Sequence, residues 1–100
     1  MSDKIRVEID KELEDLIPTY LSNLEKNMQK IAAAAAAGNQ DEVRSLGHNM
    51  KGSGGGYGFQ QVSEIGKSIE EAAKAGDLDA IPAKIKELKH YLTTIDINYI

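Results

Sequence analysis

Apolar residues recur at three- and four-residue steps along most of this chain, and this spacing constrains the fold more than any other feature of the sequence. Such spacing places apolar side chains along one face of an α-helix. The four series cover residues 13–35, 43–50, 59–73 and 78–95. Four amphipathic helices joined by short connections predict an all-α fold, an antiparallel up-down-up-down four-helix bundle.

Capping and breaking residues predict where the first two helices begin and end. Asp10 can cap the first helix, but Pro18 lacks a backbone donor and disfavours helical geometry at the preceding residue. We therefore expect a kink or a short break at Pro18. Gly38 ends this helix, and Asn39 with Glu42 three residues later is typical of the cap of a second helix.

Glycine and proline also predict the boundaries of the later helices. The second helix is expected to fray between Gly54 and Gly58, and Gly76 ends the third. We expect Asp79 to cap the fourth helix, which places Pro82 in the first turn, where no backbone donor is needed.

The two ends of the chain alternate apolar and polar residues, which is a strand pattern. Residues 5–9 read Ile-Arg-Val-Glu-Ile, and residues 95–99 read Ile-Asp-Ile-Asn-Tyr. These short extended segments could pair as a ladder beside the bundle, or cap its base.

Length and composition narrow the possible classes of protein. One hundred residues predict one domain, residues 1–100, and a net charge of −4 argues against nucleic acid or an anionic membrane as the main partner. No apolar run approaches the roughly 20 residues of a membrane span. The chain has no cysteine, so it has no disulfide framework. We expect a cytoplasmic monomer.

The segment from His48 to Gly58 is unusual for a helix that only has to be stable. At about 100° per residue, His48 lies roughly 160–200° from the inward Leu46 and Met50, so its ring is expected to face the solvent. Gly52, Gly54 and Gly55 together would cost the helix roughly 2–3 kcal/mol relative to alanine. One interpretation is a helix end that dissolves into a flexible glycine loop beside an ordinary surface histidine. The other is a nucleophilic imidazole on a surface cleared for another protein's active site.

Several other chemistries do not fit the residues. The glycine segment lacks a G-x-G-x-x-G pattern, and Lys51 precedes the glycines, so no nucleotide-binding kinase site is expected. The two histidines lie on separate predicted helices, which argues against a histidine metal site; we predict no metal and no cofactor. His90 is interpreted as a solvated surface histidine.

The same segment resembles the motif of histidine phosphotransfer (HPt) domains, which is His-x-Leu-Lys-Gly-Ser, a few small residues, then an apolar residue and Gly. The matching residues are His48, Met50, Lys51, Gly52, Ser53, Tyr57 and Gly58, with a looser match through Val62, Ile69 and Glu70. The departures are Met50 for the usual Leu, Gly66 where cysteine or a small residue is common, and the run Gly54–Gly56. None of them touches the histidine.

This resemblance implies a phosphorelay intermediate rather than an enzyme with its own kinase site. His48 would accept a phosphoryl group through its distal ring nitrogen from the aspartate of a receiver domain, and pass it to another receiver. The receivers would belong to response regulators or hybrid histidine kinases and would supply the Mg²⁺.

The same interpretation assigns roles to residues near His48. Lys51 would lie beside the phosphate, Gly52 would leave clearance for the partner, and Arg44 would add a second cation. Gln60 and Glu64 on the third helix are candidates for orienting the ring. The alternative is a four-helix interaction module that binds receivers or helical partners without accepting phosphate.

Overall fold

The computed structural model describes residues 4–100, and this range contains four α-helices with a short strand at each end. The α-helices are α1 (Ile17–Ala36), α2 (Gln40–Gly56), α3 (Gln60–Lys74) and α4 (Ile81–Thr94). The strands are β1 (Ile5–Ile9) and β2 (Ile95–Tyr99), and the 3₁₀-helices are η1 (Lys11–Leu13) and η2 (Leu78–Ala80).

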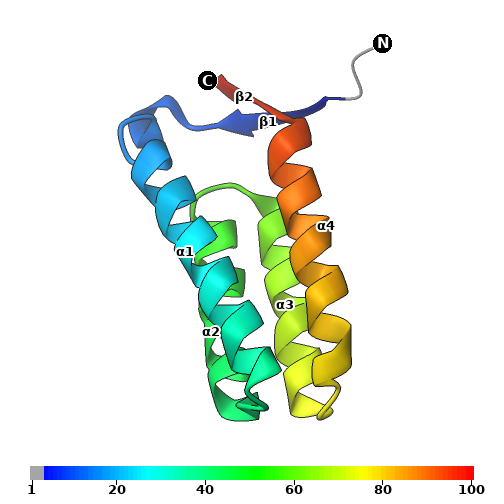
Figure 1. Cartoon of the computed structure of the whole chain (residues 1–100). Helices are drawn as coiled ribbons and strands as arrows, with labels where there is room; N and C mark the ends of the chain where they lie inside the picture. Colours follow the sequence, from blue (N-terminus) through cyan, green and yellow to red (C-terminus); the bar gives the residue numbers. More distant parts are fainter. Residues whose placement is uncertain (1–3) are drawn as a thin grey trace.

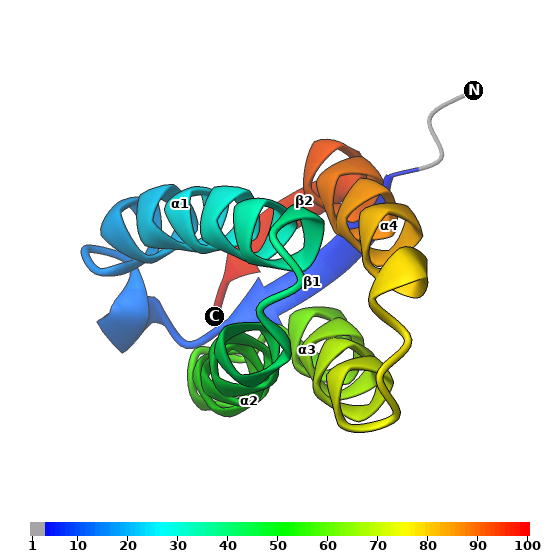
Figure 2. The same ribbon diagram turned by 60° about the horizontal axis from the view of Figure 1, so that its bottom comes forward.

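The four helices form the predicted antiparallel bundle. They run alternately up and down, and in the end-on view they surround one core (Figures 1 and 2). Each helix contacts its neighbours in the chain, and α1 also contacts α4, which closes the bundle. Every helix contributes fully buried side chains to one cluster, among them Leu24, Ile31, Val43, Met50, Val62, Ile69, Ile81 and Leu88. The apolar series of the sequence therefore define the inward faces.

The terminal segments pair as a two-stranded parallel sheet across one end of the bundle (Figure 1). Ile5 lies opposite Ile95, and Ile9 lies opposite Tyr99. The pairing is parallel because both strands cross this end from the α4 side toward the α1 side (Figure 1). Ile9 is buried, and Val7, Ile97 and Tyr99 pack against the core. The hypothesis that the two ends pair is confirmed.

The ends of the helices differ in two places from the sequence prediction. Asp10 accepts a hydrogen bond from the backbone of Glu12, so it caps η1 rather than α1. The expected break in the helical pattern lies just before Pro18. Residues 14–16 form a turn, and α1 begins at Ile17 with Pro18 in its first turn. Pro82 lies in the first turn of α4 as predicted, but Asp79 does not cap that helix. A 3₁₀ turn precedes α4 and takes in Asp79, which moves the start of the helix to Ile81.

Candidate functional site

Three glycines allow α2 and α3 to pack with their backbones in contact. A Cβ atom on Gly54 would lie 2.6 Å from the Ser63 nitrogen, and one on Gly47 would lie 2.8 Å from the Glu70 nitrogen. From the other side, a Cβ on Gly66 would lie 2.6 Å from the Lys51 nitrogen. These contacts fix the register of the two helices. They also correct the expectation that Gly54 clears the outer surface, because Gly54 is buried against α3.

This register places His48 level with Glu70. Gly47 lies against the backbone of Glu70, so the next residue of α2 presents its ring to the Glu70 carboxylate. Nδ1 of His48 lies 3.0 Å from Oε2 of Glu70. The side chain of His48 is 62% exposed, whereas that of Glu70 is 8% exposed. A largely exposed imidazole therefore rests on a buried carboxyl group.

Three side chains that can carry positive charge surround the Glu70 carboxyl group. Lys51 Nζ lies 3.2 Å from Oε1, and Lys74 Nζ lies 3.8 Å from Oε2, the oxygen that also contacts His48. Burial would raise the pKa of Glu70, but the hydrogen bonds from Lys51 and His48, with the charges of Lys51 and Lys74, hold it below its ordinary value. Glu70 is therefore ionised at neutral pH.

An ionised Glu70 determines which nitrogen of the His48 ring carries the proton. A carboxylate only accepts hydrogen bonds, so Nδ1 must be the donor in this contact. In the neutral imidazole the other nitrogen, Nε2, then keeps its lone pair. The arrangement thus holds a nucleophilic nitrogen on a largely exposed ring, with its proton fixed on the opposite side.

The structure shows where three of the predicted site residues lie. Arg44 is exposed on α2, one turn before His48. Lys51 is engaged by Glu70, as described above. Gly52 is exposed, and a Cβ atom built on it would meet nothing within 4 Å. The surface one turn beyond His48 is therefore open.

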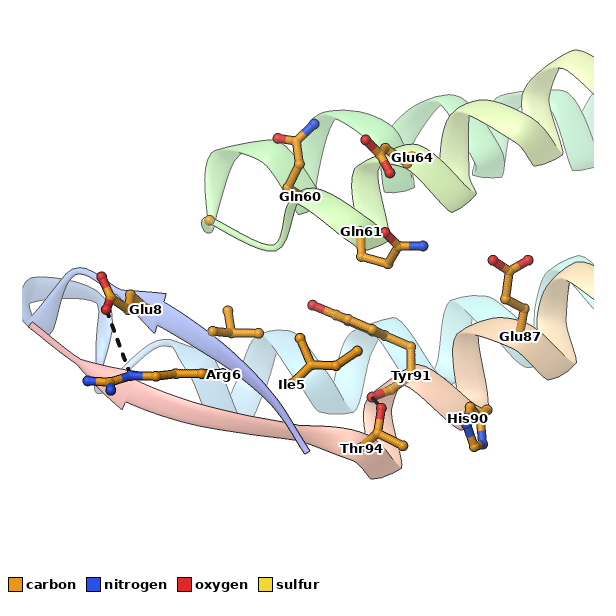
Figure 3. A pocket seen from close by; sticks show the side chains of 12 residues that line it. Ile5, Arg6, Glu8, Gln60, Gln61, Glu64, Glu87, His90, Tyr91 and Thr94 are labelled. Atoms are coloured by element: carbon orange, nitrogen blue, oxygen red, sulfur yellow. Dashed lines mark hydrogen bonds and ion pairs between the residues drawn. The ribbon is translucent and has the colours of Figure 1, made fainter. Parts of the chain in front are cut away.

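Gln60 and Glu64 are not brought to His48, so the prediction that one of them contacts the ring is wrong. Nδ1 is contacted by Glu70, which lies on α3 six residues beyond Glu64 and ten beyond Gln60, or about 9 and 15 Å along the helix. Both residues instead line a groove of about 810 Å³ between α3, α4 and β1 (Figure 3). The antiparallel register of α2 and α3 explains this, because it places the start of α3 level with the end of α2.

Glu70 is the residue that sequence reasoning left without a role. Glu70 was part of the family resemblance, but its position beside the apolar Ile69 and Ala73 did not indicate that its carboxylate contacts His48. One signal was available. Gly66 and Glu70 are one helical turn apart, so a small residue that admits α2 marks the same face of α3 as the carboxylate.

The described part of the chain contains no cluster of three or more His, Cys, Asp or Glu side chains that could hold a metal ion. Within the same residues, no helix has the length and apolar character needed to cross a membrane.

Comparison with known proteins gives one match. The family model described as Hpt domain matches residues 15–97, which include all four helices. No curated protein and no solved structure is significantly similar to the chain.

Proposed function

The chain belongs to the Hpt domain family, whose members pass phosphoryl groups through a histidine in two-component phosphorelays, and on this premise we propose that His48 is the phosphoryl acceptor. The observation that carries the proposal is the hydrogen bond between Nδ1 of the exposed His48 and the buried Glu70. Hpt domains interact with receiver domains and have no kinase site of their own. The donor and the final acceptor are accordingly receiver aspartates.

In the proposed reaction, the lone pair of Nε2 attacks the phosphorus of an aspartyl phosphate. The N–P bond forms while the P–O bond to the aspartate breaks, and the aspartate leaves as a carboxylate. The phosphorylated ring keeps its proton on Nδ1 and so carries a positive charge. Glu70 accepts a hydrogen bond from that proton and stabilises the charge. The reverse sequence at a second receiver returns the ring to its neutral form.

We assign supporting roles to three further residues. Lys51 helps to keep Glu70 ionised, and it lies three residues after His48 on α2, so its flexible side chain can turn toward a phosphoryl group on the ring. Arg44 adds a positive charge on the same exposed stripe of α2, which favours the approach of a phosphorylated partner. Gly52 leaves room for the receiver, because it carries no side chain and a Cβ atom built on it would meet nothing within 4 Å.

The remaining expectations about the protein stay predictions. We expect a single domain over residues 1–100, which acts as a monomer in the cytoplasm. Its partners would be receiver domains of response regulators or of hybrid histidine kinases.

The test is to mix the protein with phosphorylated receiver domains and follow acid-labile label. We expect label on the parent and on His90→Gln, and none on His48→Gln. The His48→Gln variant should unfold within about 0.5 kcal/mol of the parent, because the replaced side chain is exposed. Persistent label on a folded His48→Gln variant would contradict the proposal, and binding of receivers without any label would favour a pure interaction module.

A further inference from the structure

The groove beside β1 lies away from His48 and has no part in the proposed transfer. β1 belongs to a two-stranded sheet, so one of its edges has no neighbouring strand within the described residues. The four consecutive residues Ile5–Glu8 all line the groove (Figure 3). Because successive side chains of a strand point to opposite faces of the sheet, the groove runs along the edge of β1 rather than over one face of the sheet. The other walls are the first turns of α3 and the last turns of α4.

The hydrogen bonds of the sheet show which backbone groups of β1 point into this groove. Ile100 donates its N–H to the Ile9 carbonyl and accepts from the Lys11 N–H. In a parallel ladder alternate residues bond to the same neighbour, so the backbone groups of Ile5, Val7 and Ile9 face β2. The N–H and C=O groups of Arg6 and Glu8 consequently face the open edge. Such an edge is a template for an added strand.

The charges around the groove are mostly negative. Glu8, Glu64 and Glu87 line it, and Arg6 is engaged by Glu8 at 3.8 Å. Within residues 4–100, neither Glu64 nor Glu87 forms an ion pair. Ile5 is 50% exposed, and Val7 and Tyr91 add apolar surface to the same groove. Carboxylates beside an apolar strand edge complement an extended segment that alternates basic and apolar residues.

We propose that the open edge of β1 binds an extended segment of another protein that alternates lysine or arginine with apolar residues. The segment adds a third strand to the β1–β2 sheet through the backbone groups of Arg6 and Glu8. Its basic side chains reach Glu64 and Glu87. Because the groove extends along α3 from Gln60 only as far as Glu64, about 9 Å along the helix from Glu70, a partner held there leaves His48 accessible to a receiver.

The probe for this proposal is the peptide acetyl-Lys-Val-Lys-Val-Lys-amide, with acetyl-Glu-Val-Glu-Val-Glu-amide as the control for charge. We expect the lysine peptide to bind and to slow amide hydrogen exchange at Arg6 and Glu8, the two groups that face the open edge. We expect no such protection from the glutamate peptide. Protection of other amides but not these two, or no binding of either peptide, would overturn the proposal.

Two further comparisons separate strand addition from simple charge attraction. Lysine peptides N-methylated at the valines or at the lysines should differ in affinity by about tenfold or more, because only one alternate set of N–H groups faces β1. Equal affinities would overturn the proposal.

Glu87→Lys should weaken binding about tenfold, whereas Glu25→Lys, an equal charge change at an exposed site on α1, should weaken it less than about twofold. If a higher concentration of the protein itself, without peptide, slows amide exchange at Arg6 and Glu8, the edge binds a second copy of this chain. That result would show that the proposal is wrong.

Discussion

At the scale of single residues, the molecule concentrates charge beneath one exposed ring. Glu70 is a buried carboxylate, and it stays ionised because Lys51, Lys74 and His48 contact it from the solvent side. A single buried carboxyl group thereby fixes the proton of His48 on Nδ1, and in the proposed function it would offer a countercharge to the phosphorylated ring. In this account Glu70 is a positioning residue, because it acts through His48 and does not touch the phosphoryl group.

The positioning role predicts a change in the tautomer of His48. In the parent, ¹⁵N NMR of the neutral ring should show the proton on Nδ1. In Glu70→Ala the hydrogen bond is lost, so the tautomer in which Nε2 carries the proton should gain population and the rate of phosphoryl acceptance should fall. In Glu70→Gln the amide oxygen can still accept a hydrogen bond from Nδ1. This variant should therefore recover the parent's tautomer more fully than it recovers the parent's rate of phosphoryl acceptance. An unchanged tautomer in Glu70→Ala would show that Glu70 only serves stability.

The lowered pKa of Glu70 also predicts how stability depends on pH. Since the folded state favours the ionised form, Glu70 contributes stability that is fully present above its ordinary pKa of 4.5 and is lost as the pH falls through the lower folded value. The difference in unfolding free energy between the parent and Glu70→Gln should therefore be constant near neutral pH and should shrink below about pH 4.5. Denaturant titrations at a series of pH values measure this. A difference that does not change with pH would contradict the assignment.

At the scale of the helices, the glycines of α2 serve two different purposes. Gly47 and Gly54 lie against the backbone of α3 and set the register that brings His48 to Glu70. Gly52 lies on the opposite, open side and contacts nothing that a methyl group would disturb. The same residue type thus packs one face of the helix and leaves the other bare.

This division predicts opposite effects for the same substitution at two sites. Gly54→Ala should lower the unfolding free energy by about 1–3 kcal/mol, because its Cβ would overlap the backbone of Ser63. Gly52→Ala should raise it by up to about 1 kcal/mol through helix propensity alone. Thermal or denaturant unfolding of the two variants measures both. Equal destabilisation by the two substitutions would show that Gly52 has a packing role.

A longer side chain at Gly52 separates stability from transfer. Gly52→Gln should fold at least as stably as the parent and yet accept phosphate at least about tenfold more slowly, because the side chain would stand between His48 and the receiver. Gly52→Ala is the matched control, with the same helical backbone and almost no added bulk. If Gly52→Gln is strongly destabilised but transfers normally per folded molecule, the account of an open surface is wrong.

The helical pattern of the sequence was sufficient to predict the bundle, since Val43, Met50, Val62 and Ile69 are buried as their spacing requires. It could not predict the partner of His48. That contact depends on how α2 and α3 slide along each other, and the register is set by close contacts at Gly47, Gly54 and Gly66 that periodicity does not encode. Alternation predicted the terminal strands, but the direction of their pairing follows only from the three-dimensional path of the chain.

At the scale of the whole molecule, the two ends of the chain close the bundle at one end. The β1–β2 pair ties the entry of the chain to its exit, and buried Ile9 extends the core toward the sheet. The whole bundle forms the connection between the two parallel strands. A sheet of only two strands is stable here because it packs on the end of the bundle.

Removal of β2 should therefore loosen β1. Deletion of residues 96–100 takes away Ile97 and Tyr99, both packed against the core, and should lower the unfolding free energy by at least about 1 kcal/mol. Amide exchange should accelerate at Val7 and Ile9, whose backbones face β2, while the centres of α2 and α3 stay protected. Fast exchange at Val7 and Ile9 in the intact protein would contradict the pairing.

The most direct test of the central claim is to identify the phosphorylated atom. The protein, labelled with ¹⁵N at histidine, is phosphorylated by a receiver domain and examined by NMR for coupling between phosphorus and the ring nitrogens. The account predicts coupling to Nε2 of His48, with Nδ1 still carrying its proton against Glu70. Coupling to Nδ1, or to a nitrogen of His90, would contradict it.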